Sequence, residues 1–74
     1  MFEFVVCSKK HLEGEWYNNT YQITPTKEQG DVYKYTSRQR YESIDYVFYI
    51  VKEIVEDARR EGIDIVDIQI KKTS

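Results

Sequence analysis

The sequence predicts an α+β domain: a largely antiparallel four-stranded sheet that packs, as a two-layer sandwich, against one long amphipathic helix. Several short segments alternate apolar and polar residues with the period of a half-buried strand, whereas one long segment repeats its apolar residues with the period of a helix. The segments follow the order β-β-β-α-β. An apolar sheet face and an apolar helix stripe bury each other when they meet as two layers. We therefore expect residues 1–74 to form a single domain.

Three of the expected strands are residues 2–7, 32–36 and 63–72, because each alternates in period two and is rich in β-branched or aromatic residues. We expect the more apolar face of each strand to point towards the helix. Those faces hold Phe2, Phe4 and Val6 in the first segment, Tyr33 and Tyr35 in the second, and Val66, Ile68 and Ile70 in the third.

The remaining expected strand is residues 16–24, where Tyr17, Tyr21 and Ile23 share one side. Pro25 ends it, because proline cannot donate to a strand ladder. We expect this more apolar side, too, to face the helix.

Two turns are expected around this strand. Residues 26–31 form a polar turn in which Gly30 supplies the positive φ angle. Asn18-Asn19 offers an alternative, since it can form a two-residue hairpin turn and thereby add a short fifth strand over residues 12–17.

The helix is expected from about residue 40 to residue 61. Either Ser37 or Ser43 can cap its start, and Gly62 suits the left-handed residue that follows a helix. At about 100° per residue the apolar side chains fall within one arc of roughly 160°. They are Ile44, Val47, Phe48, Ile50, Val51, Ile54, Val55 and Ala58.

Composition excludes several classes of protein. The chain has 74 residues, net charge −2, one cysteine (Cys7) and one histidine (His11), so an internal disulfide is impossible and a four-ligand zinc site is not expected. We expect no metal and no cofactor. No apolar run approaches the ~20 residues of a membrane-spanning helix, so we expect a cytoplasmic protein that does not enter membranes.

Catalysis is not expected either. The sequence contains no phosphate-binding loop, GxGxxG or GxSxG motif. Cys7 and His11 lie four residues apart, but the first falls in an expected strand and the second in a loop, and neither an orienting residue nor an oxyanion site accompanies them. We therefore expect a protein that is not an enzyme.

The widths of the two layers predict a binding surface. Four strands at ~4.8 Å span nearly 20 Å, whereas one helix is about 10 Å across. Either the loop over residues 8–15 covers the remainder, or the tyrosines at the sheet margin stay half exposed, or a second chain covers them, a homodimer being the simplest case. Exposed tyrosine-rich surface is typical of protein interfaces. The expected partner-binding residues are Trp16, Tyr17, Tyr33 and Tyr35 of the sheet and Tyr46, Tyr49 and Ile50 of the helix.

An alternative function is a small nucleic-acid or nucleotide binder. Lys34, Arg38 and Arg40 cluster near the end of the third strand and the start of the helix. Tyr33, Tyr35 and Trp16 would supply rings for stacking. In size, composition and lack of catalytic motifs, the chain resembles the short α+β proteins that phages encode to bind and inhibit host proteins. That resemblance implies an inhibitor, adaptor or regulator acting in the host cytoplasm.

Overall fold

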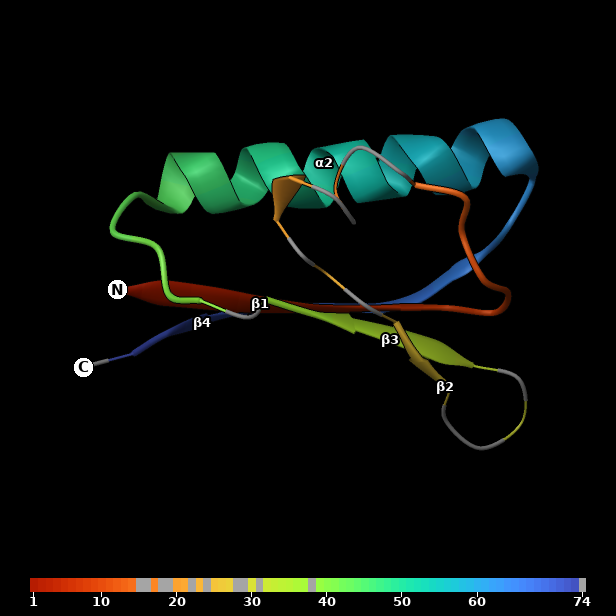
Figure 1. The fold of residues 1–74 in the computed structure, drawn as a ribbon, viewed down its shortest axis with the longest axis horizontal. Helices are drawn as coiled ribbons and strands as arrows, with labels where there is room; N and C mark the ends of the chain where they lie inside the picture. Colours follow the sequence, from red (N-terminus) through yellow and green to blue (C-terminus); the bar gives the residue numbers. More distant parts are fainter. Residues whose placement is uncertain are drawn as a thin grey trace.

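The computed structural model describes residues 1–14, 17, 20–21, 23, 25–27, 30, 32–37 and 39–73. Its elements are β1 (Phe2–Ser8), β2 (Thr26–Lys27), β3 (Tyr33–Thr36), α2 (Ile44–Glu61) and β4 (Ile65–Lys72). The strands form one antiparallel sheet, and α2 packs on one face of it, as Figure 1 shows. The expected two-layer α+β fold is therefore confirmed.

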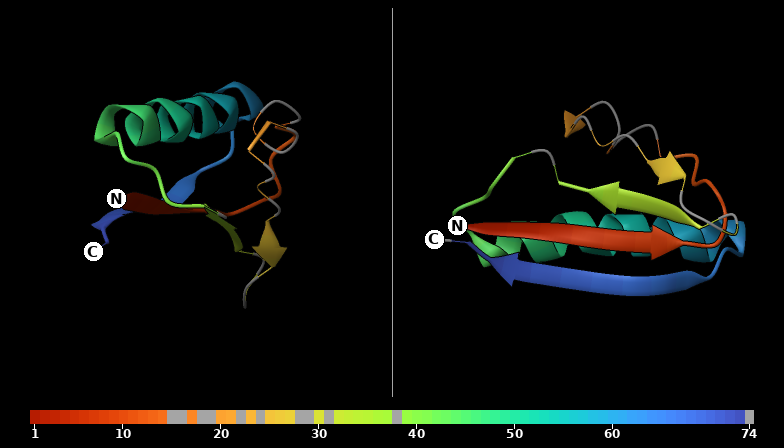
Figure 2. Two further views of the ribbon diagram at one scale, coloured as in Figure 1. Left: turned by 60° about the vertical axis from the view of Figure 1, so that its left-hand side comes forward. Right: turned by 90° about the horizontal axis from the view of Figure 1, so that it is seen from below.

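The sheet has the strand order β2-β3-β1-β4, so β1 lies in the interior and β4 forms one margin (Figure 2). β1 pairs with β3 through Val6 opposite Tyr35, and with β4 through Val6 opposite Ile68 and Phe4 opposite Ile70. Residues directly opposite one another share a face. Because Phe4, Val6 and Tyr35 are buried in the core, this register places Ile68 and Ile70 on the helix side of the sheet.

Both ends of α2 follow the sequence signals. Ser43 is the N-cap and accepts a hydrogen bond from the Tyr46 N–H (3.3 Å). At the other end Gly62 has φ 70°, its N–H donates to the Arg59 carbonyl (3.2 Å), and the Ile63 N–H donates to the Ala58 carbonyl (2.8 Å). The helix begins later than residue 40, because Tyr41 still bridges to Phe2 as an extension of the sheet.

The strand expected over residues 16–24 is wrong. Tyr17 and Thr20 are helical, and the Tyr21 N–H donates to the Tyr17 carbonyl (3.1 Å), which is the spacing of an α-helical turn. A separation of four residues fits both the strand period and the helix period, and the sequence pattern was assigned to the wrong one. The second strand is instead Thr26–Lys27, inside the expected turn, while Gly30 has the expected positive φ of 77°. The suggested hairpin at Asn18-Asn19 lies outside the described residues.

The segment between β1 and β2 forms a second cover over the sheet, beside α2. Its side chains Leu12, Tyr17, Tyr21 and Ile23 are buried in the same core as the inward faces of β1 and β3. This cover lies on the β3 side of the helix, because Tyr17 donates a hydrogen bond to Asp57 of α2 (3.1 Å) and its ring meets that of Tyr35 edge-on at 6.2 Å.

Tyrosine hydroxyls connect this cover to the two regular layers. The Tyr35 hydroxyl accepts from the Leu12 N–H (2.7 Å), and the Tyr46 hydroxyl donates to that of Tyr21 (2.9 Å). Burial raises the pKa of Tyr17, Tyr21 and Tyr35 above the ordinary value, and the carboxylate of Asp57 raises that of Tyr17 further. The fold therefore keeps these three phenols protonated.

Gly14→Ala tests the close packing of the cover. Gly14 is buried, and a Cβ atom at this position would overlap the ring of Tyr17. We expect the free energy of unfolding to fall by about 1–3 kcal/mol, as for other overpacked positions, which chemical denaturation would measure. In a Tyr17→Leu background the same substitution should cost less. Equal costs in both backgrounds would contradict this packing.

Alkaline pH tests the three buried phenols. Their folded pKa values are raised, so their contribution is complete below the unfolded value of about 10 and is lost as pH rises above it. We expect the free energy of unfolding to fall between pH 9 and 11 (about 1.4 kcal/mol per pH unit per tyrosine at most), measured by urea denaturation at each pH. Tyr17→Phe should make this fall shallower. An unchanged slope in that variant would show that Tyr17 is not one of the groups responsible.

Candidate protein-binding site

Three of the residues expected to bind a partner belong to the core instead. Tyr17, Tyr35 and Ile50 are at most 2% exposed, so a partner cannot reach them while the fold is intact. They are buried because the segment between β1 and β2 covers the tyrosine margin of the sheet. Tyr33 is half buried against His11, whose ring meets it edge-on at 5.4 Å.

Tyr46 and Tyr49 are exposed on α2, as the sequence pattern indicates. Tyr46 also has a structural role, because its ring packs against those of Tyr21 and Tyr41 at centroid distances of 5.7 and 5.4 Å. Trp16, the remaining expected residue, lies outside the described residues.

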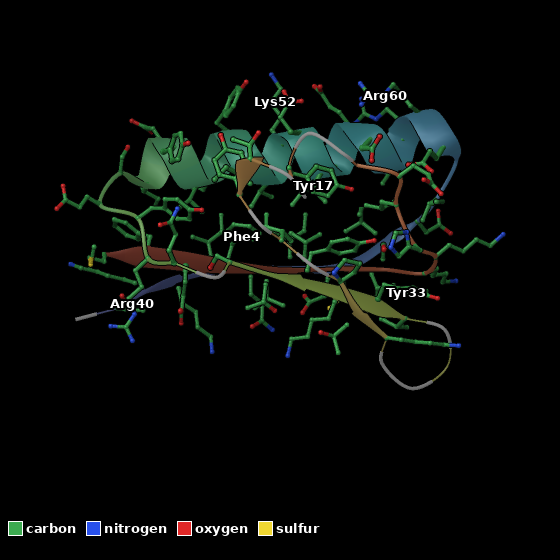
Figure 3. All side chains as sticks on the ribbon, in the orientation of Figure 1. Phe4, Tyr17, Tyr33, Arg40, Lys52 and Arg60 are labelled. Carbon is green, nitrogen blue, oxygen red and sulfur yellow. The ribbon has the colours of Figure 1, made fainter. Side chains whose placement is uncertain are left out.

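Of the basic side chains expected to bind nucleic acid, those that the structure describes do not lie beside the tyrosine rings expected to stack on bases. Lys34 lies between Tyr33 and Tyr35 in β3, so its side chain points to the opposite face of the sheet. Figure 3 places Arg40 near the chain's N-terminus and Tyr33 at the other end of the sheet. Arg38 is outside the described residues. The described residues therefore offer no surface on which Lys34 or Arg40 adjoins a stacking platform of Tyr33 and Tyr35.

Exposed apolar side chains gather on the other flank of the helix, facing β4. Phe48 and Ile44 of α2 are 50% and 38% exposed, and Val66 and Ile68 of β4 are 51% and 45% exposed. We call these four residues the α2–β4 apolar surface. Exposed apolar patches of this kind mark binding sites more often than single exposed residues do.

Helix geometry places Phe48 and Ile44 on that flank. They are four residues apart, hence on one side of α2, and Val55 follows Phe48 by two turns. Val55 shares a groove with Ile65 of β4. The opposite flank of α2 carries Asp57 and Tyr46, which hydrogen-bond to Tyr17 and Tyr21. One flank is therefore covered by the segment between β1 and β2, and the other flank stands above β4.

The groove extends the α2–β4 apolar surface to the C-terminal end of the helix. It is open to solvent and has a volume of about 360 Å³. Its lining is mainly apolar, with one cation and one carboxylate, and comprises Val55, Ala58, Arg59, Gly62, Ile63, Asp64 and Ile65. Sequence reasoning expected Phe48, Ile44, Val66 and Ile68 to be core residues. That expectation is wrong for Phe48, Ile44 and Ile68 because α2 lies over β1, as Figure 2 shows, and covers β4 only in part. At Val66 the strand register shifts, and Ile65 instead lies opposite the buried Ser8.

The backbone of β4 adds hydrogen-bonding groups to this surface. Met1 and Thr73 exchange backbone hydrogen bonds (3.1 and 2.7 Å), so at Thr73 these groups point towards β1. In an antiparallel ladder, the backbone N–H and C=O groups of successive residues point alternately towards and away from the neighbouring strand. Ile68, Ile70 and Lys72 therefore direct their N–H and C=O groups away from β1, whereas a register shift between Cys7 and Ser8 of β1 interrupts the alternation before Val66. No strand lies beyond β4 in the described part of the sheet.

Other kinds of site were sought in the same residues. Where the structure describes the chain, no three His, Cys, Asp or Glu side chains gather as they would around a metal ion. Within those residues no helix is long and apolar enough to cross a lipid bilayer. A comparison with models of protein families finds no match, and neither the curated proteins nor the solved structures contain a chain that matches this one.

Proposed function

We propose that this chain is a small non-catalytic protein-interaction module that binds a partner protein through the α2–β4 apolar surface. The observation that carries the proposal is the position of this surface. Four half-exposed apolar side chains lie on α2 and on the edge strand β4, in which Ile68, Ile70 and Lys72 direct their backbone groups outward. A partner that adds a strand to β4 would cover both at once, which is a common mode of peptide and protein recognition.

The energies indicate that the partner must use the strand edge as well as the apolar side chains. Full burial of a large apolar side chain contributes about 1.5–3 kcal/mol, so burying the exposed halves of four contributes roughly 3–6 kcal/mol. Association costs an estimated ~4–15 kcal/mol in lost rigid-body freedom. Apolar contact alone therefore does not hold a stable complex. Backbone pairing along β4 supplies further binding energy and fixes the orientation of the partner.

The biological role that fits such a module is that of an inhibitor, adaptor or regulator, because it acts by occupying a surface rather than by chemistry. The resemblance in size and composition to short phage-encoded inhibitors supports this role, with the host cytoplasm as its place of action. Tyr46 and Tyr49 form a second, smaller exposed surface on α2.

Affinity capture from a lysate of the source cells tests the proposal. Phe48→Gln removes the largest ring of the α2–β4 apolar surface, and Lys52→Gln is the matched control one turn further along α2, at a position that is also exposed. We expect one stoichiometric protein to be captured by the wild type and by Lys52→Gln. Capture by Phe48→Gln should fall at least tenfold, about 1.4 kcal/mol in binding energy.

The capture is repeated after nuclease treatment and at about 50 and 200 mM salt. Binding to phosphate weakens steeply over this range, whereas an apolar interface hardly responds. Recovery of nucleic acid alone, or equal capture by Phe48→Gln and the wild type, would refute the proposed surface.

A further inference from the structure

We propose that the partner of the α2–β4 apolar surface is a second copy of this chain, paired antiparallel along β4 about a two-fold axis at Gln69. This inference rests on the proposed function and names its partner. Pairing would join two sheets into one continuous sheet. Because the axis is perpendicular to the sheet, both α2 helices would lie on the same face.

The order of charges along β4 favours a second copy in the antiparallel direction. Asp67 lies in the first half of the strand, and Lys71 and Lys72 lie at its end. A parallel copy in register would place lysine beside lysine. An antiparallel copy reverses the order and brings the acidic half of each strand to the basic half of the other. Opposite charges directly across from one another stabilise a strand pair, and like charges destabilise it.

The register follows from three requirements on the self-paired strand. Residues opposite one another must share a face, Ile68 and Ile70 must supply outward hydrogen bonds, and opposite charges must lie across from one another. An axis at Ile68 would place Asp67 opposite Gln69 of the second copy. An axis at Asp67 would place the two aspartates opposite each other. An axis at Gln69 places Asp67 opposite Lys71 of the second copy, and the symmetry makes this pair twice.

The same register fits the helix side of the sheet. It places Ile68 of each copy opposite Ile70 of the other, so two exposed isoleucines gain apolar neighbours. Three strand spacings of ~4.8 Å separate the two copies of β1, which puts the helices above them about 14 Å apart. Closely packed helices are about 8–10 Å apart. The wider gap leaves room for one Phe48 ring from each helix.

The β2 margin of the sheet is a poorer site than β4 for pairing with a second copy. β2 is two residues long, whereas β4 is eight residues long. A two-residue edge offers little backbone to pair with, and such short edges are one way in which proteins avoid unwanted association. The α2–β4 apolar surface also lies beside β4, so apolar contact and backbone pairing coincide at that edge.

Charge exchange tests the pairing. We expect sedimentation velocity of the wild type, across micromolar to millimolar concentration, to show a reversible dimer. Asp67→Lys or Lys71→Asp alone places like charges opposite each other twice and should weaken the dimer about tenfold or more. The double variant Asp67→Lys with Lys71→Asp restores opposite charges and should restore the dimer.

The double variant also separates pairing from folding. Lys71 lies opposite Glu3 of its own β1, so Lys71→Asp carries an intramolecular cost that the double variant keeps. Recovery of the dimer therefore cannot come from recovery of the fold, and thermal unfolding of each variant would verify this. Failure of the double variant to dimerise, with the fold intact and the wild type dimeric, would overturn the register.

Disulfide trapping tests the axis directly. In the proposed register Gln69 is opposite its own copy in a pair without backbone hydrogen bonds, where Cα atoms are about 4.5 Å apart. That distance lies within the range that a disulfide spans. We expect Gln69→Cys, in a Cys7→Ser background, to form a covalent dimer readily under mild oxidation.

Lys72→Cys in the same background is the matched control, because its side chain is also exposed on β4 and is not part of the Asp67–Lys71 pair. Its counterpart in the second copy would lie six residues along the strand, about 20 Å away. Equal trapping at both positions would overturn the register. A wild type that stays monomeric and a Gln69→Cys variant that forms no covalent dimer would overturn the second copy as partner. If the monomeric wild type still captures another protein through Phe48, the proposed function holds and only the second copy as partner is refuted. If it captures no protein, the proposed function and the second copy as partner are both refuted.

Discussion

The width of one helix relative to a four-stranded sheet governs the rest of this structure. Four strands span nearly 20 Å, and a helix with its side chains covers about 10–12 Å. The apolar face therefore needs a second cover. On the β3 side the chain supplies one in the segment that carries Leu12, Tyr17 and Ile23, all buried. On the β4 side the described residues supply nothing beyond α2, and Ile68 and Phe48 remain half exposed. The core is thus covered along its β3 margin and partly exposed along its β4 margin.

The tyrosines account for the closed side. A segment that contributes no strand to the ladder cannot satisfy all its backbone groups by strand pairing, so its buried N–H groups need side-chain partners. Tyr35 reaches from β3 to the Leu12 N–H, and Tyr17 reaches from the segment to Asp57 of α2. A phenylalanine at either position would fill similar volume but leave a polar group unsatisfied. Tyrosine combines a large ring with a hydroxyl at its tip, which is what a connection between layers requires.

The sequence predicts the parts of this fold that have a single local signal. Gly62 marks the end of α2, and period two marks β1, β3 and β4. The start of α2 has two candidate caps in the sequence, Ser37 and Ser43, and the structure uses Ser43. Where one spacing fits two periods, as between Tyr17 and Tyr21, the prediction fails. The prediction of the partner-binding residues fails for a different reason. The layer widths predict a remainder that the helix does not cover, and they leave open whether a loop or a second chain covers it. Periodicity shows which face of a strand is apolar and not which flank of the sheet the helix covers. The tyrosine margin was therefore expected to be open, and the margin of Val66 and Ile68 is open instead.

The open margin also shows how a long exposed strand can avoid unlimited association. An apolar edge of eight residues is a template for aggregation unless something restricts its pairing. An aspartate in its first half and two lysines at its end provide such a restriction, because a parallel copy in register brings lysine to lysine and an antiparallel copy centred on Asp67 brings aspartate to aspartate. In a two-fold pair that places Asp67 opposite Lys71, the β4 edges of both copies are paired with each other. In the described part of the sheet, the outer strand that remains in each copy is the two-residue β2, which cannot recruit a third copy in the same way. The charge order along β4 therefore favours an assembly that closes at two chains over one that grows.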